Sequence, residues 1–234
     1  MSDPFFHEPL RAALVAAALV VPVAVARAAT VGGCAAGAVA AAWLAWAGGR
    51  PALVAFAALV VVGTWTSRLG RERKRREGVA QSDGGRRAAR HVLANAGPAL
   101  LAVALGEGGY VERDVAIAAA CGAFAGNLAD TASGELGMLF PRPPRLLLFG
   151  PIVRRGTNGG MTWPGLWCGV VSGSLVAALN ADVVSVIPIC VAALVGTLTD
   201  SLLGACIEGK FGIGNETVNF TSGAVAAFCA GACV

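Results

Sequence analysis

Two glycine-rich stretches place an aspartate at the same position of a shared frame. GNLADTASG (126–134) and GTLTDSLLG (196–204) both read Gly-x-Leu-x-Asp-[Thr/Ser]-x-x-Gly, with Asp130 and Asp200 at equivalent positions. A carboxylate in so apolar a segment is costly, roughly 2.5–3.5 kcal/mol for Asp on membrane-insertion scales, and usually faces a cavity or a partner. We therefore predict that two helices of the same orientation, forming a parallel pseudo-repeat, turn these acids toward one another.

Helical spacing decides which other acids can join this pair. Glu208 lies eight residues beyond Asp200, about 80° around a helix that turns 100° per residue. Glu135 follows Asp130 by five residues, which corresponds to about 140°. We expect all four acids to be catalytic residues, but Glu135 reaches the site only if the helix loosens near Gly134. Otherwise it serves a neighbouring face.

A second polar stretch, RRGTNGGMTWPG (154–165), precedes another apolar segment. A glycine-rich loop at a helix N-terminus presents free backbone N–H groups, and the helix dipole favours an anion there. The motif is weak, because no Walker lysine pattern accompanies it. The predicted phosphate contacts are Arg154, Arg155, Gly156, Thr157, Asn158, Gly159, Gly160 and Lys210. The predicted hydrogen-bonding partners of ligands are Asn95, Asn127, Asn215 and Asn219.

The acids and asparagines form a set of hard oxygen ligands, which suits Mg²⁺. We predict Asp130, Asp200 and Glu135 as metal ligands, with Glu208 as a further ligand or a holder of water. Mg²⁺ commonly shares its coordination shell with substrate phosphates. The two histidines are too few and too far apart for a zinc site. The seven cysteines include no C-x-x-C pair, so we interpret them as packing residues with free thiols.

The composition indicates which elements position these residues. Of 234 residues, 56% are hydrophobic and only 14% are charged, whereas a soluble domain has about 25% charged residues. The long apolar runs exclude a transmembrane barrel, whose strands alternate apolar and polar residues. We predict an all-α polytopic membrane protein with about seven to eight transmembrane helices. The candidate spans are 10–27, 30–48, 51–67, 90–106, 114–138, 163–180, 184–206 and 218–233.

Basic loops set the predicted orientation. The connections at 67–90, 139–162 and 207–217 carry most of the arginines and lysines, and they alternate with less basic connections at 107–113 and 181–183. By the positive-inside rule the basic loops are cytoplasmic, both termini are outside, and the site lies in the cytoplasmic half. We treat 1–234 as one transmembrane domain. It comprises N-terminal helices without site motifs (1–67), a basic cytoplasmic loop (68–90) and catalytic helices (91–234).

Five segments in this order resemble the phytyl-phosphate kinase family of integral membrane proteins from plants, algae, archaea and bacteria. They are RRAARHVLANAG (86–97), NLADTASGELG (127–137), RRGTNGGMTWPG (154–165), GTLTDSLLGACIEGK (196–210) and NETVNFTSGA (215–224). The resemblance places family acids on Asp130, Glu135 and Asp200, and the family loop on residues 156–160. His91, Glu208 and Glu216 depart from the pattern, which bears on substrate choice and metal count.

The resemblance implies transfer of a phosphoryl group from a nucleoside triphosphate, CTP in related alcohol kinases, to a prenyl monophosphate such as phytyl or geranylgeranyl phosphate. It implies a prokaryotic plasma membrane or a plastid membrane, lipid partners and no nucleic acid. The acceptor phosphate has a second pKa of about 6, so it is already a nucleophile at pH 7 and needs no strong base. Three alternatives stay open: a lipid cytidylyltransferase-type nucleotidyl transferase, a cation or metabolite transporter, and a structural membrane protein.

Overall fold

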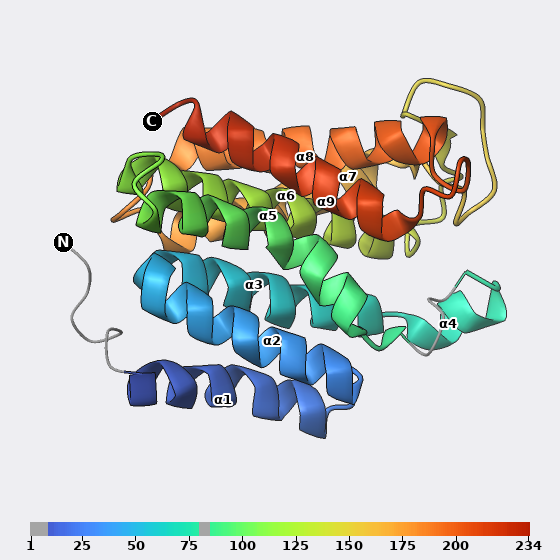
Figure 1. Ribbon diagram of the computed structural model, residues 1–234. Helices are drawn as coiled ribbons and strands as arrows, with labels where there is room; N and C mark the ends of the chain where they lie inside the picture. The colour runs from blue at the N-terminus through green and yellow to red at the C-terminus, as the bar shows by residue number, and fades with distance from the viewer. Residues whose placement is uncertain (1–8, 80–84) are drawn as a thin grey trace.

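The computed structural model describes residues 9–79 and 85–234, which are almost entirely helical (Figure 1). The long helices are α1 (Pro9–Val25), α2 (Val31–Trp43), α3 (Gly49–Arg68), α5 (Ala89–Glu107), α6 (Arg113–Gly137), α7 (Trp163–Leu179), α8 (Val186–Cys206) and α9 (Asn215–Gly231). A π-helical turn η1 (Leu44–Gly48), a short α4 (Arg71–Arg76) and a two-stranded ribbon of β1 (Arg145–Leu146) and β2 (Gly160–Met161) complete the described elements. The all-α prediction is confirmed, and each long helix matches a candidate span.

Three stretches of the described chain are long and apolar enough to cross a membrane: Val31–Arg68, Arg113–Gly137 and Val186–Cys206. The first holds two antiparallel passes, because the chain turns at Gly49, whose φ of 66° is left-handed, and α2 and α3 run in opposite directions (Figure 1). Two shorter helices, Leu14–Val25 and Trp163–Leu179, are also apolar.

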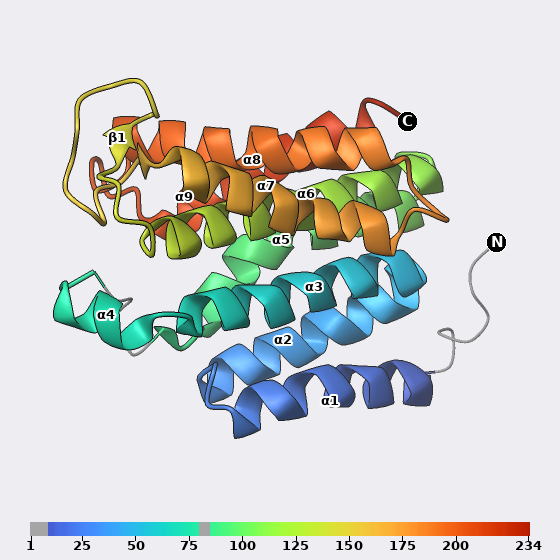
Figure 2. The ribbon, with the colours of Figure 1, turned by 180° about the vertical axis from the view of Figure 1, so that it is seen from behind.

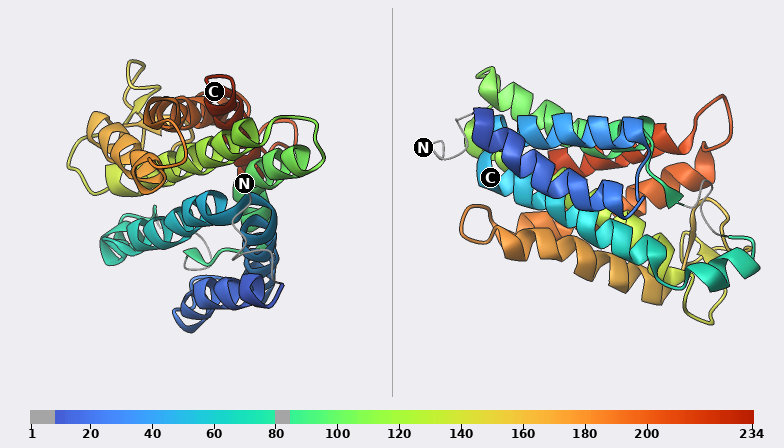
Figure 3. Two further views of the ribbon diagram at one scale, coloured as in Figure 1. Left: turned by 90° about the vertical axis from the view of Figure 1, so that its left-hand side faces the viewer. Right: turned by 90° about the horizontal axis from the view of Figure 1, so that it is seen from below.

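Consecutive long helices alternate in direction, so the connections fall at two ends of the molecule. Figures 1 and 2 show the α4 region, the β1–β2 loop and the α8–α9 connection at one end, and the α5–α6 and α7–α8 connections at the other. The three basic loops of the sequence therefore share one end, as predicted. Viewed along the helices (Figure 3), α1–α3 lie beside the α5–α9 group.

Helix α6 is the centre of the fold and contacts α3, α5, α7, α8 and α9. Small residues permit these close helix contacts. A Cβ at Gly165, Gly169 or Gly173 of α7 would lie 2.7, 2.4 or 2.6 Å from a backbone carbonyl oxygen of α6. This stripe at intervals of four residues brings two helix backbones together, as small residues do in membrane helix packing. One cluster of buried apolar residues runs from Ala16 in α1 to Ala230 in α9.

Candidate active site

The two glycine frames cross, and their aspartates meet. A Cβ on Gly196 of α8 would lie 2.6 Å from the Cα of Gly126 on α6, so the first glycines of the two frames touch. About one turn further along each helix, Asp130 and Asp200 line the same pocket, close enough for each carboxyl group to affect the ionisation of the other. The structure thus brings together the two acids that the repeat related, on helices that run in the same direction (Figure 1).

Helix α9 supports one member of the pair. The Ser222 hydroxyl donates to Asp200 Oδ2 at 3.1 Å and also lies 3.2 Å from the Asn219 carbonyl oxygen. Ser222 is almost fully buried. Sequence reasoning missed this serine, although it lies within the NETVNFTSGA segment. A buried hydroxyl on a neighbouring helix holds the carboxylate in one orientation, which a ligand site requires.

Both aspartates line a pocket of about 200 Å³ between the ends of α6, α7 and α8 and the β1–β2 loop. The other predicted site residues that line it are Glu208, Arg155, Gly156, Thr157, Asn158, Gly159, Gly160 and Asn215. Most of the predicted acids and the complete glycine loop therefore surround one cavity at the end of the molecule that carries the basic loops.

The glycine loop reaches this cavity by a close approach to α8. Gly156 and Gly159 have φ values of 81° and 73°, a left-handed conformation that favours glycine. A Cβ on Gly159 would lie 2.5 Å from Ala205 Cβ and 2.6 Å from the Ser201 carbonyl oxygen, next to Asp200. A Cβ on Gly204 would lie 3.1 Å from the Gly159 nitrogen. Gly204, the last glycine of the 196–204 frame, therefore leaves room for the loop.

The sequence predicted that this loop lies at a helix N-terminus, but in the structure it does not lie at the N-terminus of α7. Strand β2 separates it from the helix, and the α7 N-cap is Thr162, whose hydroxyl accepts from the Gly165 N–H at 3.1 Å. Within the loop, the Thr157 and Gly160 N–H groups donate to the Arg154 and Thr157 carbonyls. Any phosphate contact must therefore use the remaining loop N–H groups and side chains, because these donors and the α7 cap are engaged.

Glu135 does not reach the aspartate pair. Helix α6 is continuous through Gly134, so Glu135 faces the opposite side and forms a buried ion pair with Lys74 of α4. Each side chain is less than 5% exposed. The Lys74 ammonium also lies 3.4 Å from the Thr66 carbonyl oxygen of α3. The predicted role of Glu135 as a metal ligand is not supported by this placement, which makes it part of a contact between α4 and α6.

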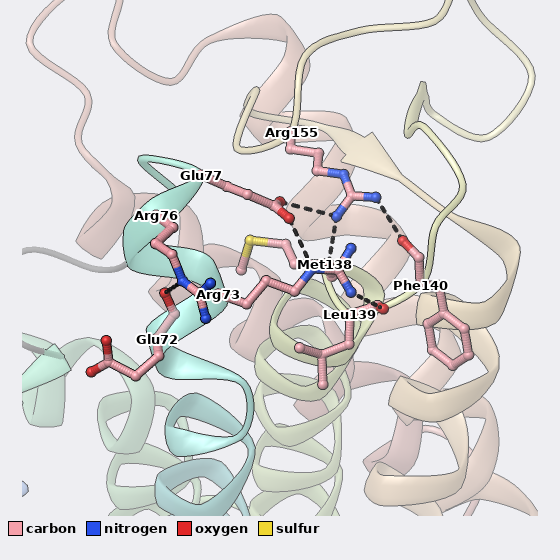
Figure 4. A network of polar contacts seen from close by, with 8 residues as sticks. All are labelled: Glu72, Arg73, Arg76, Glu77, Met138, Leu139, Phe140 and Arg155. Carbon is pink, nitrogen blue, oxygen red and sulfur yellow. Dashed lines mark hydrogen bonds and ion pairs between the residues drawn. The ribbon is translucent and has the colours of Figure 1, made fainter.

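Arg155 fastens the loop to the end of α6 (Figure 4). Its guanidinium donates to the carbonyl oxygens of Met138 and Phe140, each at 2.7 Å, and to Glu77 Oε2 at 3.2 Å. Arg73 donates to Glu77 Oε1 at 2.8 Å and to a further carbonyl at the same helix end. Hydrogen bonds and charge interaction with Arg73, followed by the charge of Arg155, hold the pKa of Glu77 below its usual value. Two cations thus cap the carbonyls of α6.

The remaining predicted residues lie outside the cavity. Arg154 is exposed, and Lys210 donates to the Cys206 carbonyl oxygen at 2.9 Å. Asn127 is buried and donates to the Asn95 carbonyl oxygen at 2.8 Å, so it joins α6 to α5. The residues outside the lining are therefore Arg154, Lys210, Asn95, Asn127, Asn219 and Glu135. The Asn127 side chain thus serves helix packing rather than contact with a ligand in this cavity.

Arg142 is the lining cation that sequence reasoning missed. It is exposed and forms no side-chain hydrogen bond or ion pair with the described residues. Its signal in the sequence is RPPR at 142–145, in one of the basic loops that predict the orientation. Glu208 also lines this pocket. Desolvation raises its pKa, and the negative charge of nearby Glu216 raises it further. The lining of this cavity therefore includes a cation without a partner among the described residues and an acid with a raised pKa.

The comparisons with known proteins agree with this architecture. Residues 14–227 match the family described as integral membrane protein DUF92. The chain belongs to this family. It is 34% identical over 185 residues to protein PGR of Arabidopsis thaliana, covering 65% of this chain and 64% of that protein. It is 30% identical to the uncharacterized membrane protein MJ0933 of Methanocaldococcus jannaschii over 171 residues, covering 71% and 69%.

A further relative is protein VTE6 of Arabidopsis thaliana chloroplasts, 27% identical over 188 residues, covering 76% of this chain and 56% of that protein. No solved structure matches the chain. The aligned part spans just over half to about two thirds of the length of these relatives. The family match and these relatives confirm the predicted integral membrane location and the family membership inferred from the motifs.

Proposed function

We propose that this protein transfers a phosphoryl group from a nucleoside triphosphate, CTP on the family resemblance, to a prenyl monophosphate such as phytyl or geranylgeranyl phosphate. One observation carries the proposal: Asp130 and Asp200, from two related frames, meet in a pocket that a glycine loop closes. Membership in the family that includes VTE6 supports the same reaction class.

The donor set fits Mg²⁺. Among the described residues no group of three or more His, Cys, Asp or Glu side chains is close enough to hold a metal alone. Mg²⁺ does not need one, because it usually takes one or two carboxylates and completes its shell with water and substrate phosphates. Asp130 and Asp200 would hold the ion, and their mutual repulsion would be relieved by it. When bound, Mg²⁺ would neutralise the charge of the transferring phosphate.

The residues of the chain position the two anions. An oxygen of the prenyl phosphate attacks the γ-phosphorus, a new P–O bond forms, the bond to the β-phosphate oxygen breaks, and the nucleoside diphosphate leaves with that electron pair. No proton has to be removed from an acceptor that is already anionic. Arg142 and the free N–H groups of the 156–160 loop would hold donor phosphates. Such fixed positive groups provide most of the catalysis in phosphoryl transfer.

The basic end of the molecule is assigned to the cytoplasm, where nucleotides are present. We refer to the pocket lined by Asp130, Asp200 and the 156–160 loop as the donor pocket. It opens at this end, beside the β1–β2 loop, and all three basic loops lie there (Figures 1 and 2). Nucleoside triphosphates carry several charges and do not cross the bilayer core, so their site must open to water. The lipid acceptor would enter from the adjoining leaflet.

The direct test is a screen of prenyl monophosphates against the four nucleoside triphosphates with Mg²⁺, using purified protein in detergent and analysing the lipid product. A prenyl diphosphate formed by wild type but not by Asp130→Asn supports the proposal. Asp182→Asn is the matched control, because Asp182 pairs with Arg50 at the opposite end and should retain activity. A nucleotidyl-lipid product would instead establish a nucleotidyl transferase. Solute uptake by proteoliposomes without nucleotide consumption would establish a transporter.

A further inference from the structure

The N-terminal helices, which carry no motif, enclose an apolar cavity with a polar end. This cavity, of about 100 Å³, lies between α1, α2, α3 and the start of α5. Side chains such as Leu19, Val23, Phe56 and Val60 form its apolar walls. At one end it reaches Arg87, His91, Asn95 and Thr131, and Thr131 directly follows Asp130 on α6. We refer to this cavity as the apolar groove.

A basic pocket adjoins the groove. This arginine pocket, of about 370 Å³, is lined by Arg27, Arg68, Arg71, Arg86 and Arg87. No carboxylate among the described residues lines it. The arginine pocket and the apolar groove share Ala28, Thr64 and Arg87, so one cavity continues into the other. A surface that places several arginines beside an apolar slot is complementary to an amphiphile with an anionic head.

Several polar groups that line the arginine pocket have no partner among the described residues. Among the described residues, Arg27, Arg71, Arg86 and Arg87 make no side-chain hydrogen bond or ion pair, and the buried Ser67 hydroxyl has no partner either. Arg27, Arg71 and Arg86 are exposed, so their charges stay hydrated, whereas a buried polar group without a partner, such as the Ser67 hydroxyl, costs about 1–3 kcal/mol. Burial lowers the pKa of the half-buried Arg87 guanidinium, and the charges of Glu135 and Asp130 act in the opposite direction. A phosphate would satisfy these donors.

We infer that the apolar groove and the arginine pocket together bind the lipid acceptor, a single-chain prenyl monophosphate. The inference rests on the proposed function for the identity of the lipid. The first isoprene units would lie between α1 and α3, and the phosphate would lie on Arg87, within electrostatic reach of Asp130. One narrow groove accommodates one branched chain, whereas a bilayer phospholipid has two. The N-terminal helices, which the sequence left without a role, therefore form the acceptor site.

The test is equilibrium binding of radiolabelled geranylgeranyl monophosphate to the purified full-length protein in detergent, without nucleotide. Two variants alter the site. Arg87→Gln removes the shared cation, and Gly63→Leu fills the groove, because a Cβ at Gly63 finds its nearest neighbour, Thr131 Cγ2, at an ordinary 3.7 Å. Each should raise the dissociation constant about tenfold or more, the size expected for losing a charge-assisted contact or occupying the site. Gly63→Ala should bind like wild type.

Two controls match these changes elsewhere. Arg75→Gln removes a cation from the same basic region, but Arg75 is exposed and lines neither cavity. Ala224→Leu fills a different apolar cavity, between α5 and α9, whose lining includes no charged residue. Both should leave the affinity within about threefold of wild type, as surface changes away from a site usually do. Retained nucleotide binding shows that a variant is folded.

Three results would overturn the acceptor site: no binding by wild type, unchanged binding in both site variants, or equal competition by phosphatidic acid, which would indicate a bilayer lipid. Failure of the proposed function is a separate observation. If the site variants lose binding as expected while no prenyl phosphate is ever phosphorylated, the acceptor site stands and the kinase reaction is wrong. If both variants phosphorylate geranylgeranyl phosphate with the wild-type KM, the reaction stands and the site is wrong.

Discussion

Two glycines of the 156–160 loop allow a test of how the loop reaches α8. Gly156 and Gly159 both have left-handed backbones, with φ of 81° and 73°. Only Gly159 approaches α8, where a Cβ would lie 2.5 Å from Ala205 Cβ and 2.6 Å from the Ser201 carbonyl oxygen. Among the described residues, a Cβ at Gly156 would contact only Val79, at 3.6 Å. Gly156→Ala and Gly159→Ala therefore share the backbone strain and differ in the steric clash.

The magnitudes follow from these two terms. An alanine in the left-handed region costs roughly 1–2 kcal/mol. Overpacking against a fixed backbone costs roughly 1–3 kcal/mol more. Because 1.4 kcal/mol corresponds to a factor of ten, Gly156→Ala should lower kcat/KM for the nucleotide by roughly thirtyfold at most. Gly159→Ala carries both terms, roughly 2–5 kcal/mol together, and should lower kcat/KM by between roughly thirtyfold and several thousandfold, since the loop must move away from Asp200.

The assay is nucleotide-dependent phosphorylation of a prenyl phosphate, with nucleotide affinity measured separately by calorimetry. Thermal unfolding in detergent shows whether both variants remain folded. Equal losses in the two variants would mean that strain alone matters and that the approach of the loop to α8 is incidental. A near-wild-type Gly159→Ala would refute the closed donor pocket altogether.

Three further expectations follow from the described contacts. Asp200→Asn should lower kcat at least about a hundredfold, while thermal unfolding in detergent shows an intact fold. Near-full activity at low Mg²⁺ would instead mean that the acid has a structural role. Glu135→Gln should destabilise the protein by about 3–5 kcal/mol, because Lys74 is left buried and unpaired, whereas Lys74→Met with Glu135→Leu should recover most of the loss; equal unfolding temperatures for single and double variants would contradict this. An impermeant thiol reagent should reach a cysteine placed at Thr157 only after permeabilisation and one at Gly109 in intact cells; the reverse pattern would invert the orientation.

Much of the scaffold could be predicted, because it depends on local and one-dimensional signals. Each long helix matched a run of apolar residues, and the basic loops met at one end since short connections make successive helices alternate. The meeting of Asp130 with Asp200 was also predictable, because the matched glycine frames specify both the approach of two helices and the faces in contact.

What the sequence could not give is the partner of each charge. Lys74 lies in RERKRR, a run typical of a solvated loop, yet the structure buries it against Glu135. Arg155 resembles a phosphate ligand, but the carbonyls at the end of α6 take its donors. These pairings join segments 61 and 17 residues apart, and no local pattern reports which distant group will satisfy a cation. The acceptor cavity was invisible for the same reason, since its walls come from four helices.

Helix α6 separates the donor pocket from the apolar groove, so the two substrates must meet across it. Asp130 faces the pocket and Thr131 faces the groove. At 100° per residue, Gly134 lies about 40° from Asp130 in the direction of Thr131, and therefore between the two cavities. A Cβ there finds no atom within 4 Å, so the helix has an open notch at this point. The acceptor phosphate can meet the donor through this notch.

Filling the notch should therefore uncouple binding from reaction. Gly134→Leu fits without displacing the backbone, so we expect wild-type binding of geranylgeranyl monophosphate but a kcat reduced about a hundredfold, as a misplaced reacting group causes. Nucleotide affinity is measured separately, because Gly134 also lines the donor pocket. Gly134→Ala leaves most of the notch open and should lose much less. If Gly134→Leu instead weakens acceptor binding and leaves kcat unchanged, the phosphate already lies in the notch when it binds. If it alters neither, the two cavities do not meet at Gly134, and transfer takes place on another side of α6.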